Sequence, residues 1–147
     1  MARLRPGWLV VLWSAALGVS AWLPWLTTSV GGGGRASAIG GALGSIVLPA
    51  RFGPGQLIVL LSSVLIVLGA MAARGLSPRL SAVAALLVSI LVVVLTWWYY
   101  HANVRPPVAA GYGLYLGALF AVAAVICSVW AVLVAVLRSR GTGVDGR

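Results

Sequence analysis

The chain contains few side chains that can do chemistry. Its 147 residues include one histidine (His101), one cysteine (Cys127) and one acidic residue (Asp145). General acid–base catalysis and metal binding need carboxylates, imidazoles or thiolates grouped together, and these three residues stand far apart in the sequence. The sequence therefore predicts no catalytic residues, no metal ligands and no cofactor, and we expect a protein that is not an enzyme.

Two Gly-x-Gly pairs come closest to a ligand-binding motif. They are Gly53/Gly55 and Gly111/Gly113, and each opens an apolar run. A dinucleotide fingerprint also needs a preceding strand and a distant acidic residue, which neither pair has. We expect these glycines to allow tight turns into helices and close helix approach. Their repetition also suggests two related helical hairpins.

The basic residues are ten arginines, and the formal net charge is +9. In a soluble protein such a charge would suggest a nucleic-acid partner. Here the arginines lie at the ends of apolar runs and do not cluster with aromatic residues. We therefore expect contacts with membrane lipids and no nucleic acid.

The elements that carry these residues have the composition of an integral membrane protein. Hydrophobic residues make up 62% and charged residues 7% of the chain, against about 25% charged residues in soluble domains. Four uncharged apolar segments are long enough to cross the ~30 Å hydrocarbon core as helices. They cover residues 8–26, 56–73, 80–100 and 114–137.

We thus predict one all-α membrane domain over residues 1–147, a four-transmembrane-helix bundle. The connections are an outer loop (27–55), an inner loop (74–79), a second outer loop (101–113) and a tail (138–147). Seven arginines lie in the two tails and the inner loop, and three lie in the outer loops. The positive-inside rule then predicts a bacterial inner-membrane protein with both termini in the cytoplasm.

The N-terminal segment has a second interpretation. It resembles a secretory signal peptide, with a small-residue cleavage site at Val19-Ser20-Ala21. Cleavage would leave the orientation of the other helices unchanged, so the sequence leaves both interpretations open.

Aromatic residues gather at the predicted outer boundary of the membrane. We expect six of them to anchor the helices at headgroup depth. They are Trp22, Trp25, Trp97, Trp98, Tyr99 and Tyr100. Pro24 lies between the first two, and we expect it to kink the last turn of the first helix.

Two stripes of small residues are expected to let the predicted helices pack closely, with weak hydrogen bonds between helices. They are Ser81, Ala85 and Ser89 on the third helix and Gly113, Gly117 and Ala121 on the fourth. The same stripes are candidates for contact with a membrane-protein partner or a second copy of the chain.

The first outer loop is the most distinctive segment. Four glycines (31–34) lie between short β-prone runs, which predicts a short β-hairpin with a glycine turn. Residues 40–49 are apolar but too short to span, so they lie in the interface or re-enter the membrane. Five residues of this loop are candidates for folding over the bundle or docking on a partner. They are Arg35, Ile46, Val47, Leu48 and Arg51.

Leu23-Pro24-Trp25, the Thr/Ser/Gly-rich loop that follows, and Gly111-Tyr112-Gly113-Leu114 together carry a resemblance. The chain resembles small actinobacterial four-helix membrane proteins, including the tryptophan-associated transmembrane protein family. That resemblance implies a four-helix fold and no assigned activity or catalytic residue. The layout is also similar to that of claudins, although the paired loop cysteines of claudins are absent.

Taken together, these features predict a non-enzymatic accessory or scaffold subunit of a cell-envelope membrane complex. The alternative is a small transporter or channel component that handles lipids or uncharged substrates. Coupled transporters generally place ionisable residues inside the membrane, and the four predicted helices contain none.

Overall fold

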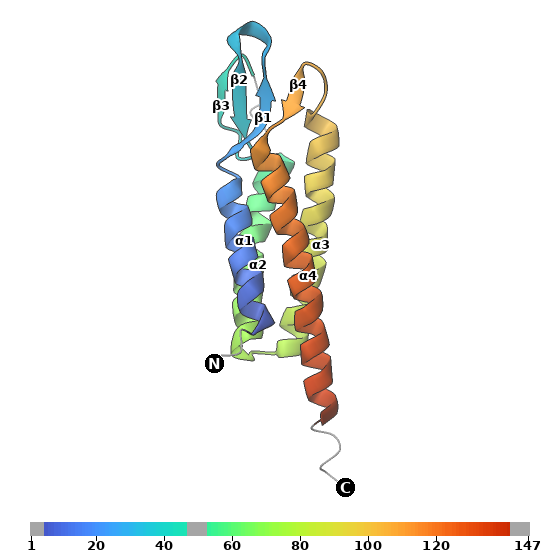
Figure 1. Cartoon of the computed structure of the whole chain (residues 1–147). Helices are drawn as coiled ribbons and strands as arrows, with labels where there is room; N and C mark the ends of the chain where they lie inside the picture. Colours follow the sequence, from blue (N-terminus) through green and yellow to red (C-terminus); the bar gives the residue numbers. More distant parts are fainter. Residues whose placement is uncertain (1–4, 47–52, 142–147) are drawn as a thin grey trace.

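The computed structural model describes residues 5–46 and 53–141, which form four helices and a small sheet (Figure 1). The helices are α1 (Pro6–Ser20), α2 (Pro54–Arg74), α3 (Pro78–Asn103) and α4 (Tyr112–Gly141). They lie side by side, with the sheet stacked on one end of the bundle. All four predicted segments contain a helix, although the first ends at Ser20 rather than at residue 26.

Three of the helices are long and apolar enough to cross a membrane. α2, α3 and α4 contain 21, 26 and 30 residues, whereas α1 is an apolar helix of only 15. At about 1.5 Å per residue, α1 is about 22 Å long, short of the ~30 Å hydrocarbon core. To span the hydrocarbon core, α1 would need the turn that follows it or a locally thinner bilayer.

The prediction that Pro24 kinks the end of a helix over 8–26 is wrong. α1 ends at Ser20, and Pro24 is the first residue of strand β1 (Pro24–Thr28). Pro24 has no N–H to donate to the Ser20 carbonyl four residues earlier, so the helix loses a backbone hydrogen bond at this point. The chain closes instead with two tighter bonds, from Trp22 N to Val19 O and from Leu23 N to Ser20 O.

The sheet has four antiparallel strands in the order β3-β2-β1-β4. After β1 come β2 (Gly34–Ser37), β3 (Ala42–Gly44) and β4 (Val108–Ala110). β1 and β2 form the predicted hairpin, and Gly31, Gly32 and Gly33 turn the chain with positive φ. β4, which the sequence analysis missed, pairs with β1 and joins the second outer loop to the first.

Over its described part, the apolar segment 40–49 belongs to the sheet and does not fold back along the bundle. Its position in the membrane interface stays a prediction. Residues 42–44 form β3, the edge strand that pairs with β2. Ile46, just beyond it, is 9% exposed and packs against Gly34. Val47, Leu48 and Arg51 lie outside the described residues.

In the bundle, α1 and α3 each pack against both α2 and α4. The predicted stripe on α3 is buried, because Ser81, Ala85 and Ser89 all face the core. The two serine hydroxyls donate within their own segment of the chain, Ser81 to Leu76 O and Ser77 O, and Ser89 to Leu86 O. These serines therefore contribute small size to the packing rather than the predicted hydrogen bonds between helices.

Candidate functional site

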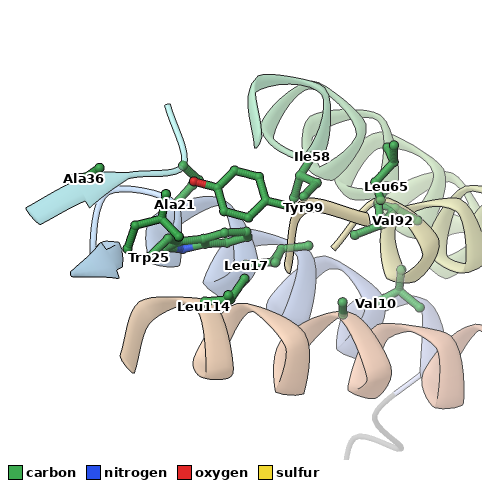
Figure 2. Close-up of a cluster of buried hydrophobic side chains, with 14 of the residues drawn as sticks. Val10, Leu17, Ala21, Trp25, Ala36, Ile58, Leu65, Val92, Tyr99 and Leu114 are labelled. Atoms are coloured by element: carbon green, nitrogen blue, oxygen red, sulfur yellow. The ribbon is translucent and has the colours of Figure 1, made fainter. Parts of the chain in front are cut away.

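The sheet is fixed to the bundle through Trp25. This side chain is fully buried, and its indole N–H donates to Ser20 O at 2.8 Å. Ser20 O also accepts a bond from Leu23 N at 3.0 Å, and the indole N–H takes the place of the helical donor that Pro24 cannot supply. The Trp25 ring also meets Tyr99 edge to face, with ring centroids 5.2 Å apart (Figure 2).

Two of the six predicted interface anchors are therefore wrong. Trp25 is 0% exposed and Tyr99 is 5% exposed, so neither ring reaches the lipid headgroups. The other four (Trp22, Trp97, Trp98 and Tyr100) are exposed, as an anchoring ring must be. Their position in the headgroup layer stays a prediction.

The glycines of α4 make room for the Trp25 ring. A Cβ at Gly117 would lie 2.6 Å from Cζ2 of Trp25, and one at Gly113 would lie 2.9 Å from its Cδ1. Real Cβ atoms do not approach so closely, because packed interiors leave no spare space. Gly113 and Gly117 thus leave space for the aromatic side chain of Trp25 from β1. Ala121, the third residue of the stripe, is also buried.

Backbone bonds hold the sheet at two further points. Ala38 N donates to Ala21 O at 3.2 Å, and Gly111 N donates to Trp25 O at 2.7 Å. The Gln56 side chain, in the first turn of α2, donates to Ile39 O at 3.1 Å. The sheet therefore meets α1, α2 and α4 through defined contacts, and it can act as a rigid platform.

The second glycine of each Gly-x-Gly pair lies in the first turn of its helix, next to the sheet. Gly55 contacts Ala38, and Gly113 contacts Leu23 and the Trp25 ring. A side chain at Gly55 would collide with the backbone of Ala38, and one at Gly113 would collide with Leu23 and the Trp25 ring. The predicted role of these glycines in close approach is confirmed, with the sheet rather than another helix as the neighbour.

The outer side of the platform carries a hollow of about 370 Å³. Its lining includes Trp22, Pro24, Arg35 and Leu43, together with parts of β2 and β3. Trp22 and Leu43 are each 77% exposed, and Arg35 is exposed beside them. We call this feature the outer hollow. Of the candidate loop residues, Arg35 lies in it, whereas Ile46 is buried within the chain and cannot dock.

A second feature is an apolar groove of about 480 Å³ between α3 and α4 near the sheet. Trp97, Tyr100 and Tyr115 are among its lining residues. His101 meets the Trp97 ring edge to face, with centroids 4.6 Å apart. The Thr96 hydroxyl, also in the lining, donates to Val92 O at 2.8 Å, so its proton is already used within α3.

The described residues hold no grouping of histidine, cysteine and acidic side chains that could bind a metal. Cys127 is buried, and Asp145 lies outside the described residues. Two buried hydroxyls, those of Ser14 and Ser128, have no hydrogen-bond partner.

Sequence reasoning missed the burial of Tyr99, although the pattern contained a signal for it. The small residues Ser81, Ala85 and Ser89 continue at helical spacing through Val92 and Thr96 to Tyr99, and all six are buried. The register of the stripe thus placed Tyr99 on the inner face. The sequence predicted an interfacial position for Tyr99 because this residue lies within a cluster of aromatic residues at the end of the helix.

Comparison of the chain with family models, with curated proteins and with solved structures finds no match.

Proposed function

We propose that this chain is a non-enzymatic accessory or scaffold subunit of a cell-envelope membrane complex. In this proposal α1 to α4 all cross the bacterial inner membrane, both termini are cytoplasmic, and the sheet lies on the outer side. The outer hollow is the surface that meets the partner.

The observation that carries the proposal is the combination of a fixed platform and exposed anchors. Trp25 locks the sheet to the bundle, while Trp22 and Leu43 remain 77% exposed around Arg35. Tryptophan and arginine are enriched among residues that dominate protein–protein binding energy. A rigid surface also loses little conformational entropy on association. Exposed apolar side chains on such a surface are therefore best explained by a partner.

Arginines at the opposite end support the orientation. Arg5, Arg74, Arg79, Arg138 and Arg140 all lie at or beyond the helix ends that are remote from the sheet. The sheet end carries Arg35 and Arg105 among the described residues. This distribution favours a cytoplasmic position for the arginine-rich end.

The test is crosslinking in native membranes followed by gentle solubilisation and mass spectrometry. The variant Trp22→Ala/Leu43→Ser should reduce recovery of the crosslinked partner by roughly tenfold, as loss of one hot-spot contact would. The matched control is Trp98→Ala, which removes a similarly exposed ring from α3 outside the hollow. Equal recovery from both variants, or a monomer that crosslinks to nothing, would overturn the proposal.

The apolar groove favours a second candidate, a lipid-handling role. Its volume of about 480 Å³ lies within the ~300–1,000 Å³ range of small-molecule sites. Ala118 lines the groove, so Ala118→Trp should fill it and remove lipid that co-purifies with the protein. Unchanged lipid content in that variant would eliminate this candidate.

A further inference from the structure

The bundle end opposite the sheet has two adjoining hollows bordered by arginine side chains. The larger, about 460 Å³, is lined by Arg79 of α3 and Arg138 of α4. The smaller, about 100 Å³, is lined by Arg5 and again by Arg138. Pro78 and Ala135 line both, so the hollows are contiguous. Together we call them the arginine hollow.

Its positive charge has no acidic partner within the described part of the chain. Asp145, the sole acidic residue, lies outside residues 5–46 and 53–141. Arg5 donates one guanidinium N–H to Ala73 O at 2.8 Å, which leaves its charge without a counter-charge. Arginines gathered from three segments around one hollow therefore attract an anion from outside the chain.

The start of α3 adds to this attraction. Pro78 and Arg79 are its first two residues, and Ser77 makes no side-chain capping bond. The first N–H groups of a helix lack partners within the helix, and they carry the positive end of its dipole. The start of α3 therefore adds positive electrostatic potential beside Arg79. Guanidinium groups and helix N-termini both suit phosphate oxygens.

The surroundings favour a phosphate that is attached to hydrocarbon. Leu80 lines the larger hollow and is 72% exposed, and Leu76 and Leu137 nearby are 56% and 64% exposed. These side chains lie at the end of helices that are apolar enough to cross a membrane. A lipid would place its phosphate against the arginines and its acyl chains along the leucines, which a soluble phosphate could not do.

We propose that the arginine hollow is a binding site for the headgroup phosphate of an anionic phospholipid. Arg79 and Arg138 clamp the phosphate, and Arg5 supplies additional positive charge beside it. The proposal is independent of partner docking at the outer hollow, because it concerns the opposite end of the molecule.

Lipid binding to the purified full-length protein tests the proposal. We would titrate the detergent-solubilised protein with phosphatidylglycerol and, separately, with phosphatidylcholine, and read occupancy by native mass spectrometry. Phosphatidylglycerol should bind more tightly, and more weakly at high salt. The variant Arg79→Gln/Arg138→Gln should weaken its binding by roughly tenfold or more.

The matched control is Arg74→Gln/Arg140→Gln, which removes the same charge from the same end but from residues that line neither hollow. It should retain most of the binding. Equal loss in both variants, or equal affinity for the two lipids, would overturn the proposal. Inorganic phosphate should not compete at equal concentration; full competition would assign the hollow to a soluble anion instead. If the double variant misfolds, each single substitution should still give a partial loss.

Discussion

At the scale of single residues, the junction between helix and sheet depends on a proline that ends α1 and a tryptophan that donates to the last carbonyl of that helix. Pro24 leaves Ser20 O without its helical donor, and the Trp25 indole N–H supplies one at 2.8 Å. Gly113 and Gly117 on α4 leave the space that the ring occupies. The two tryptophans on either side of Pro24 therefore have opposite environments: Trp22 is exposed and Trp25 is buried in the core.

This arrangement predicts different responses of the two tryptophans to the same substitution. Trp25→Phe keeps an aromatic ring but removes the indole bond to Ser20 O, which then retains only the bond from Leu23 N. Loss of one such hydrogen bond lowers the free energy of unfolding by about 0.5–1.5 kcal/mol. The free energy can be measured by titration from mild detergent into sodium dodecyl sulfate, followed by circular dichroism.

The control is Trp22→Phe, at a position that is 77% exposed. Surface substitutions usually change stability by less than about 0.5 kcal/mol. Comparable destabilisation of the two variants would mean that the indole bond does not hold the sheet to the bundle.

At the scale of elements, the helices could be predicted and most of the sheet could not. Uncharged runs of membrane-spanning length identified α2, α3 and α4 to within four residues at each end. The β1–β2 hairpin could be predicted because its partners are close in the sequence. β4 could not, because Thr27 pairs with Ala109, about 80 positions away, and three apolar residues in a loop carry no strand signal.

The end of α1 was ambiguous for a related reason. A proline near the end of an apolar run is compatible with a kink or with a stop. The stop is favoured because residues 24–28 gain strand partners on both sides, β2 and β4. That gain depends on tertiary structure, and it also decides which tryptophan of the pair is buried. The outer hollow follows from the same pairing, since it combines Trp22 with residues of β2 and β3.

The pairing of β1 with β4 can be tested by engineered disulfides. Thr27 lies opposite Ala109, and facing residues on antiparallel strands have Cα atoms about 4.5–5.5 Å apart, within reach of a disulfide. In a Cys127→Ala background, Thr27→Cys/Ala109→Cys should therefore crosslink under mild oxidation. The crosslink can be read as a mobility shift on a non-reducing gel.

The matched pair is Thr27→Cys/Leu43→Cys. Thr27 faces Arg35, which in turn faces Leu43, so this pair is separated by two strand spacings, about 9–10 Å. It should stay reduced under the same conditions. Rapid crosslinking of this pair instead of the first would contradict the strand order.

At the scale of the whole molecule, the structure has two chemically different ends. The sheet end carries exposed aromatic rings and the outer hollow, while the opposite end carries the arginine hollow. The helices between them present apolar side chains outward, such as Leu87, Val94 and Leu119. A bilayer around these helices would place docking of a protein partner on one side and recognition of an anionic lipid on the other.

This polarity predicts which positions a membrane-impermeant maleimide can reach. In a Cys127→Ala background, Leu43→Cys on β3 should be labelled in intact spheroplasts, because Leu43 is exposed on the sheet. Arg140→Cys, at the far end of α4, should be labelled only after the membrane is permeabilised. Gel-shift labelling before and after permeabilisation measures both. Labelling of Arg140→Cys in sealed spheroplasts, with Leu43→Cys protected, would reverse the orientation and move the arginine hollow to the outer leaflet, against the attraction of arginines to the cytoplasmic side.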